Sequence, residues 1–226
     1  MKQNQAGFTL IEIAIVLVII GLLLGGVLKG QELINSATVK NLATDFRNIP
    51  VFVYGYQDKF RALPGDDAQA QSHVGATATL GSGGALHFVP GNGLIEGNWD
   101  TATTTDESQL FWQQVRLAGL AAGPTTGDML PTNALGGLLG ITSGTYSPDP
   151  VAASAGGLNG TYIICSAAIL GKFAKQLDIQ VDDGAPTTGS LREYDSNGAR
   201  PSTLSAPTLT NGQLNDNSSY TVCMGV

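Results

Sequence analysis

The sequence has few of the residues on which most enzyme active sites and metal centres depend. It contains two histidines, His73 and His87, and two cysteines, Cys165 and Cys223, among 226 residues. Neither histidine has a carboxylate or a cysteine at a spacing typical of a catalytic triad or a zinc site. A phosphate-binding glycine loop that ends in lysine is also missing. We therefore expect no enzymatic activity, and we expect both histidines to be solvated or hydrogen-bonded locally.

Positive charge is scarce as well. The chain has 11 lysines and arginines against 18 aspartates and glutamates, which gives a formal net charge of −7. An acidic chain gains nothing from counterion release at phosphates, so we expect no general nucleic-acid binding. Lys2 is the one basic residue before a long apolar run, and it favours a cytoplasmic N-terminus by the positive-inside rule.

The two cysteines suit an oxidising compartment. In the periplasm or outside the cell, Cys165 and Cys223 would form one disulfide. Closing a loop of that length would stabilise the fold by about 4 kcal/mol in the chain-entropy model. Two separate buried thiols are the alternative, because sequence spacing does not give the distance between them.

The apolar run covers residues 8–28 and contains a single charged residue, Glu12. At 1.5 Å per residue, a helix of this length is about 31 Å long, which is enough to cross the hydrocarbon core of a bilayer. A carboxylate inside such a helix costs roughly 2.5–3.5 kcal/mol on insertion scales. The run therefore predicts a membrane-inserting helix in which Glu12 has a cationic partner.

Gly7, Phe8 and Glu12, in this order and spacing, resemble the class III signal of type IV pilins and pseudopilins. The resemblance implies that prepilin peptidase cuts between Gly7 and Phe8 and methylates the new amine of Phe8. It also implies that Glu12 pairs with the N-terminal amine of a neighbouring subunit in a filament. An ordinary secretory signal is the less favoured interpretation, because such a signal has a shorter apolar run and an Ala-x-Ala-like cleavage site. A plain membrane anchor would not explain Gly7 and Glu12 together.

Beyond the apolar run, hydrophobic residues follow one stripe of a helix that we expect to continue to about Arg61. The stripe consists of Val39, Leu42, Phe46, Ile49, Val53, Tyr56 and Phe60. Pro50 removes the amide that would bond to the Phe46 carbonyl, so we expect a kink or a break near residues 46–50. Glycines around Lys29 would allow that segment to stretch or to pack closely against another helix.

The rest of the sequence, from residue 63 onward, predicts a globular head that begins at a turn over residues 63–67. A long, glycine-rich connection follows, and residues 106–108 begin a short helix with one apolar side, on which Trp112 packs. Residues 161–165 and 220–223 read as strands that end at the cysteines, and residues 141–146 as a third strand. Residues 173–181 read as another helix.

Together these segments indicate an α+β fold with three parts. Residues 1–7 are the leader. Residues 8–62 are the N-terminal helix, membrane-spanning over 8–28 and amphipathic over 29–62. Residues 63–226 are a globular head, in which the resemblance implies a small antiparallel sheet packed against the helix and closed by the disulfide.

One acidic cluster is a candidate metal site. Asp178, Asp182 and Asp183 could offer hard oxygen ligands to calcium, although their spacing does not match the twelve-residue calcium loop. A solvated Asp-Asp-Gly turn is the favoured interpretation. We expect no other cofactor.

The resemblance implies a structural subunit of a type IV pilus-like filament. Its partners would be other copies of the chain, prepilin peptidase and the inner-membrane assembly machinery. The subunit would sit in the bacterial inner membrane with a periplasmic head before assembly, and in an extracellular pilus afterwards. Two alternatives share the signal: a pseudopilin of type II secretion, and a low-abundance minor pilin whose head binds a surface, DNA or a partner protein. Adhesion, motility, DNA uptake and secretion are therefore all candidate roles.

Overall fold

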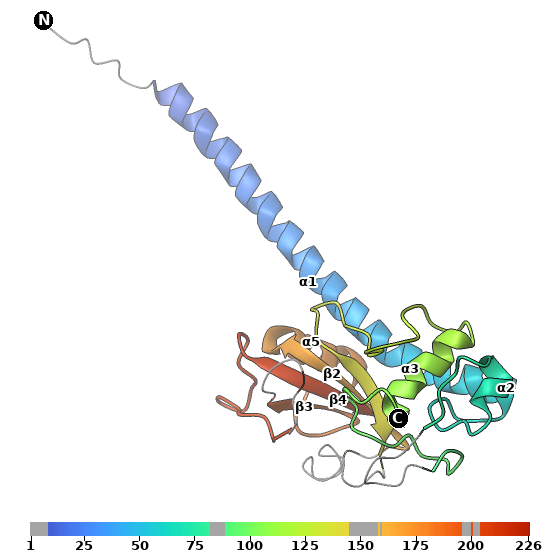
Figure 1. The fold of residues 1–226 in the computed structure, drawn as a ribbon. Helices are drawn as coiled ribbons and strands as arrows, with labels where there is room; N and C mark the ends of the chain where they lie inside the picture. The colour runs from blue at the N-terminus through green and yellow to red at the C-terminus, as the bar shows by residue number, and fades with distance from the viewer. Residues whose placement is uncertain (1–8, 82–88, 145–157, 159, 196–199, 201–203) are drawn as a thin grey trace, which may run out of the picture. The chain divides into compact units, whose positions relative to one another are not determined.

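The computed structural model describes residues 9–81, 89–144, 158, 160–195, 200 and 204–226 (Figure 1). The chain forms two compact units, Met1–Thr38 and Val39–Val226, and one long helix contributes residues to both. The elements, in chain order, are α1 (Leu10–Phe60), α2 (Ala70–Val74), α3 (Glu107–Leu117), β1 (Leu139–Ser143), β2 (Tyr162–Leu170), α5 (Gly171–Val181), β3 (Leu191–Asp195) and β4 (Ser219–Gly225). This combination of a long N-terminal helix and a small antiparallel sheet confirms the predicted α+β class.

The first part of α1 is the predicted apolar helix. Its hydrophobic side chains are exposed from Leu10 to Leu28, and the helix is long and apolar enough to cross a membrane. The glycines between residues 21 and 30 do not interrupt it. Gly7 and Phe8 lie outside the described residues, so the predicted cut and the methylation stay predictions.

The second part of α1 belongs to the Val39–Val226 unit and buries the predicted stripe. Six of its members are buried, and Phe60 is partly buried against the same core. The helix continues through Pro50 to Phe60, so the predicted break is wrong, whereas a kink is not tested. Ile49 and Val53 on either side of the proline are each 1% exposed. Their burial offsets the roughly 3 kcal/mol that a proline costs inside a helix.

The sheet has four strands in the order β1-β2-β4-β3, and every neighbouring pair is antiparallel. The two strands predicted to end at cysteines are β2 and β4, and both continue past Cys165 and Cys223. The third predicted strand is β1, which begins two residues earlier, at Leu139. Tyr146, at its predicted end, lies outside the described residues. The edge strand β3 was not predicted, because its sequence is half polar.

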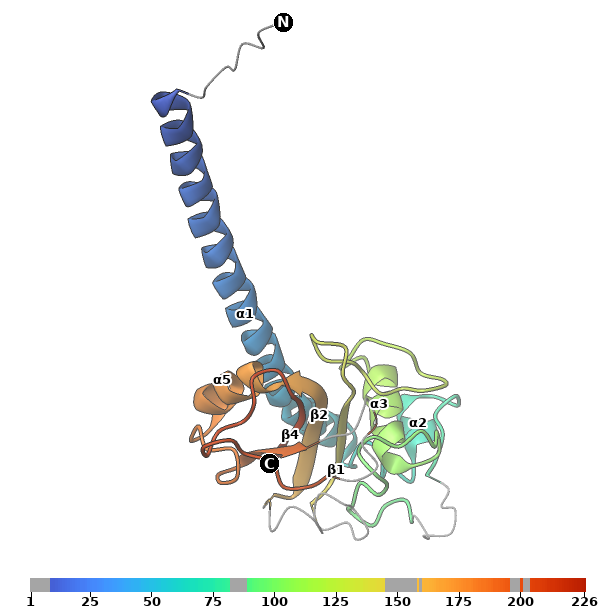
Figure 2. The same ribbon diagram turned by 90° about the vertical axis from the view of Figure 1, so that its left-hand side faces the viewer.

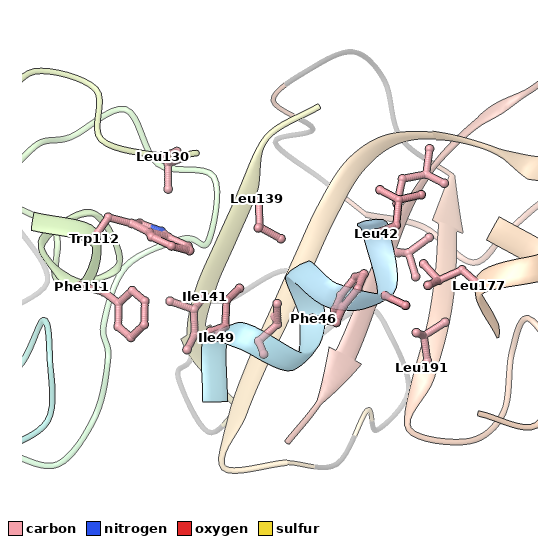
Figure 3. Close-up of a cluster of buried hydrophobic side chains, with 14 of the residues drawn as sticks. Leu42, Phe46, Ile49, Phe111, Trp112, Leu130, Leu139, Ile141, Leu177 and Leu191 are labelled. Atoms are coloured by element: carbon pink, nitrogen blue, oxygen red, sulfur yellow. The ribbon is translucent and has the colours of Figure 1, made fainter. Parts of the chain in front are cut away.

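Helices cover one face of this sheet. Residues of α1, α3 and α5 share one core on this face. Figures 1 and 2 agree that α2 and α3 lie together toward one end of the unit and that α5 lies toward the other end. In Figure 3, Phe46 of α1 points toward Leu177 of α5 and Leu191 of β3. Ile49, one turn further along α1, lies beside Ile141 of β1. The stripe of α1 is thus the centre of the main hydrophobic core.

A second, smaller core covers the opposite face of the sheet. It contains Trp99, Leu158, Ile163, Cys165, Ala167, Tyr194, Leu204 and Cys223. Because side chains alternate along a strand, Cys165 and Ile164 of β2 point to opposite faces. Both faces of the two central strands are therefore buried, which explains why their sequences are almost continuously apolar.

The helix α3 differs from the prediction of a helix with one buried side. Every residue from Glu107 to Arg116 is buried, glutamines included. The side chains of Gln113 and Gln114 accept hydrogen bonds from the amides of Thr79 and Gly65, each at 2.7 Å. These bonds hold the backbone at Gly65 and Thr79, near the start of the connection that the sequence predicts to be irregular. The described part of this connection also contains α2. Polar residues are buried here because the loop backbone is their partner.

Candidate functional site

Glu12 is held by the residue that precedes α1. Its Oε2 accepts hydrogen bonds from the backbone N–H of Thr9 at 2.8 Å and from the Thr9 hydroxyl at 2.7 Å. The Thr9 hydroxyl in turn accepts a hydrogen bond from the Glu12 amide at 3.4 Å. This reciprocal arrangement is a capping box, with Thr9 at the N-cap and Glu12 three residues later. It fixes the carboxylate at the start of the helix.

Thr9 is a site residue that the sequence analysis missed. The signal was present, since Thr-x-x-Glu before an apolar run is the sequence signature of a capping box. Without this cap, Glu12 would be an acid whose sole candidate partner came from another chain. With it, the carboxylate already has two hydrogen-bond donors within its own chain.

The comparison with protein families bears on this same segment. Residues 2–28 match the family described as the prokaryotic N-terminal methylation motif. The chain carries a prepilin-type signal. The match confirms the resemblance to the signal of type IV pilins and pseudopilins, and it spans Gly7, Phe8, Glu12 and the whole apolar run. No curated protein and no solved structure shows significant similarity to the chain.

The match covers residues 2–28, and it supports a type IV pilin-like or pseudopilin protein. The signal and the exposed apolar part of α1 are consistent with membrane anchoring before assembly.

The cysteines form a disulfide bond between Cys165 and Cys223, which are 58 positions apart in the sequence. The two residues lie directly opposite each other in the antiparallel pair of β2 and β4, and both are fully buried. The alternative of two separate thiols does not hold in the structure. The bond joins the two central strands of the sheet and ties the last strand to its middle.

The structure brings the three candidate metal ligands together. Oxygen atoms of Asp178, Asp182 and Asp183 all lie within 4.8 Å of one another. Asp178 accepts a hydrogen bond from the Gly184 amide at 3.3 Å, and Asp182 accepts one from the Leu191 amide at 2.8 Å. Asp178 is 1% exposed. Burial raises the pKa of Asp178 to about 6, and the neighbouring carboxylates Asp183 and Asp182 add to this effect.

Another buried carboxylate, Glu193, lies in β3, and its oxygens are not among those that lie within 4.8 Å of one another. Its side chain is 1% exposed, and neither carboxylate oxygen has a hydrogen-bond partner. Burial, with a smaller contribution from the negative charge of Asp178, raises the pKa of Glu193 to about 8. The sequence analysis missed this residue. The alternation along β3 could have found it, because Glu193 shares the inward face with Leu191.

His73, one of the two histidines, is hydrogen-bonded locally. Its Nδ1 lies 2.7 Å from Asp67 Oδ2, and the same oxygen accepts a hydrogen bond from the Tyr56 hydroxyl at 2.7 Å. The ring of His73 also stacks on Phe60. These contacts fasten α2 to the end of α1. His87 lies outside the described residues.

A second buried acidic group lies at the start of α3. Glu107 is fully buried, its Oε2 accepts a hydrogen bond from the Glu96 amide at 3.0 Å, and its Oε1 has no partner. Asp66, by contrast, accepts bonds from three successive amides of the turn at residues 91–93. Burial raises the pKa of Glu107 to about 8, and the charges of Asp66, Glu96 and Asp106 add to the shift.

Proposed function

We propose that this chain is a structural subunit of a type IV pilus-like filament. The observation that carries the proposal is the prepilin-type signal, which is continuous with the exposed apolar part of α1. The one acid of that part, Glu12, lies at its N-terminal end. Exposed apolar surface of this extent requires a partner, which is lipid before assembly and other apolar helices afterwards.

The proposed sequence of events begins at the membrane. Prepilin peptidase cuts between Gly7 and Phe8 and methylates the Phe8 amine, and the subunit is stored in the inner membrane with its Val39–Val226 unit in the periplasm. During storage, the Thr9 capping box supplies Glu12 with two donors. Hydrogen bonds to a charged group contribute about 1.5–3 kcal/mol, which offsets much of the cost of placing that charge near lipid.

Assembly would then bundle the apolar helices. The Phe8 amine of a neighbouring subunit is a full positive charge, whereas the Thr9 donors are dipoles. An ion pair between this amine and Glu12 is therefore the stronger interaction in a surrounding of low dielectric constant. Leaving the carboxylate without that partner inside a helix bundle would be strongly unfavourable, so Glu12 would control the addition of subunits.

The assignment is tested by mass spectrometry of sheared surface filaments and of the membrane fraction from the native organism. For a major subunit, we expect an abundant species in the filaments that begins at methylated Phe8. A processed form confined to the membrane fraction would support the pseudopilin, and trace amounts in filaments would support the minor pilin. An unprocessed N-terminus in both fractions would refute the proposal.

A substitution tests the role of Glu12. We expect Glu12→Ala to be processed and to remain in the membrane. Its filament yield should be at most about one tenth of the wild-type yield, because a loss of 1.4 kcal/mol lowers the equilibrium constant of subunit addition about tenfold. The matched control is Glu32→Ala, also on α1, where the glutamate is exposed and paired with Lys29 at 2.7 Å. Filament yields from Glu12→Ala equal to those of the control would contradict the role.

A further inference from the structure

A cleft lies between α1 and α3 on the Val39–Val226 unit. It has a volume of about 290 Å³, and its lining comes from both helices, from the segment that follows α3 and from β1. The apolar part of the lining includes Ile49, Trp112 and Leu139, which Figure 3 shows on three different elements. Pockets that hold drug-sized small molecules have volumes of roughly 300–1,000 Å³. A cleft at the lower end of this range has room for one long side chain of a protein partner.

The carboxylate of Asp45 lines this cleft without a partner. Asp45 is half-buried, and within the described residues its side chain forms no hydrogen bond and no ion pair. Burial raises the pKa of Asp45, and no neighbouring cation opposes this effect. Arg116, the other charged residue of the lining, donates instead to three backbone carbonyls between residues 122 and 129. The cleft thus contains a negative charge that the subunit itself leaves uncompensated.

A cation without a partner lies on an exposed face of the same helix. Arg47, Val51 and Tyr54 have the spacing i, i+4, i+7 and share this face of α1. Val51 and Tyr54 are 62% and 61% exposed, and Arg47 is exposed and forms no ion pair with any described residue. Arginine and tyrosine are enriched among the residues that dominate protein interfaces, and helices dock in grooves through anchors at this spacing. These three residues form the outer triplet of α1.

We propose that the outer triplet of one subunit docks on the α1–α3 cleft of a second copy of this chain, with Arg47 entering the cleft and pairing with Asp45. The aliphatic stem of an arginine packs on apolar walls, and its planar guanidinium binds a carboxylate through two hydrogen bonds. The triplet and the cleft are different surfaces, so each copy offers both. A contact of this heterologous kind builds an open helical filament when its rotation does not close a ring. This inference rests on the proposed filament role and adds a contact outside the apolar part of α1.

Charge reversal tests the pairing. The measured quantity is the yield of sheared filaments from cells that express each full-length variant in place of the wild type. Arg47→Glu should lower this yield at least about tenfold, the loss that corresponds to 1.4 kcal/mol in each subunit addition. Combining Arg47→Glu with Asp45→Lys restores opposite charges and should recover most of the yield. The matched control Lys172→Glu reverses an exposed cation on α5 and should leave the yield unchanged.

Cross-linking gives a second test that changes exposed residues alone. Val51→Cys places a thiol on the outer triplet, and Thr132→Cys places one at the edge of the cleft. The two native cysteines are already joined to each other. In filaments of the double-cysteine variant, a short thiol-reactive cross-linker should connect each subunit to the next and produce a ladder of covalent oligomers in electrophoresis. Each single-cysteine variant should remain monomeric.

Three results would overturn the inference and leave the filament role intact. The first is a wild-type filament yield from Arg47→Glu. The second is a yield from the charge-swapped double variant as low as that of Arg47→Glu, although both resist urea unfolding as well as the wild type. The third is normal filaments of the double-cysteine variant that give no ladder. A wild-type chain that forms no filaments would instead refute the proposed function, and the inference with it.

Discussion

The replacement Glu107→Gln should make the protein less sensitive to alkaline pH. Glu107 is fully buried, one of its oxygens has no hydrogen-bond partner, and its pKa is raised from 4.5 to about 8. In the unfolded chain this acid loses its proton near pH 4.5, whereas the folded protein keeps the proton until about pH 8. Between these values the folded state binds more protons, so the free energy of unfolding falls as the pH rises.

The size of the effect follows from the pKa difference. Each pKa unit corresponds to 1.36 kcal/mol, so a shift from 4.5 to about 8 is worth at most roughly 5 kcal/mol above pH 8. Glutamine has nearly the same shape and does not ionise. Its carbonyl oxygen can accept the hydrogen bond that the Glu96 amide donates to Glu107 Oε2. We therefore expect Glu107→Gln to be several kcal/mol more stable than the wild type at pH 9, and equal to it or slightly less stable at pH 5.

Urea unfolding of the full chain in detergent, followed by tryptophan fluorescence from pH 5 to pH 9, measures this difference. Trp112 lies on α3 with Glu107 and is 3% exposed, so its emission should report the loss of this region. Other buried acids also titrate, and for this reason the informative quantity is the difference between variant and wild type at each pH. Asp58→Asn, at an exposed position on α1, is the control. A difference between Glu107→Gln and wild type that stays constant across the range would refute the reasoning.

Two further predictions concern the Val39–Val226 unit. Cys165→Ser should lower the free energy of unfolding by about 4 kcal/mol, because the Cys165–Cys223 bond spans 58 positions. A reductant should lower the stability of the wild type but not that of the variant. Equal sensitivity of the two proteins to the reductant would contradict this prediction. Phe46→Ala should lower the free energy of unfolding by about 3–5 kcal/mol, because Phe46 is fully buried. The control Val51→Ala, on the exposed side of α1, should change it by less than about 0.5 kcal/mol. Similar losses for the two variants in urea unfolding would contradict the assignment of Phe46 to the core.

Several features follow from residues that are close in the sequence. The apolar run and the stripe of α1 predict a long helix, since an α-helix is set by contacts over three and four positions. Even so, the same local reasoning predicted a break at Pro50. The break is absent because packing of Ile49 and Val53 into the core outweighs the local preference of proline.

Other features depend on segments that are far apart in the sequence. The edge strand β3 has a half-polar sequence, and it is a strand because β4 offers it a complete set of backbone partners. Glu107 and the glutamines of α3 are buried because loop amides from distant positions bind them. Local periodicity could not predict these pairings, because each one requires the chain to have folded first.

The sequence by itself determined the prepilin-type signal, the apolar helix with a single acid, and the amphipathic stripe, because each is a pattern within one continuous segment. The tertiary structure alone decided that Cys165 lies opposite Cys223, and that Glu193 is buried on the face of β3 that carries Leu191. Both are relations between segments that lie apart in the sequence. The strand order and the packing of α5 on the sheet set these relations, and the spacing of the residues along the chain encodes neither.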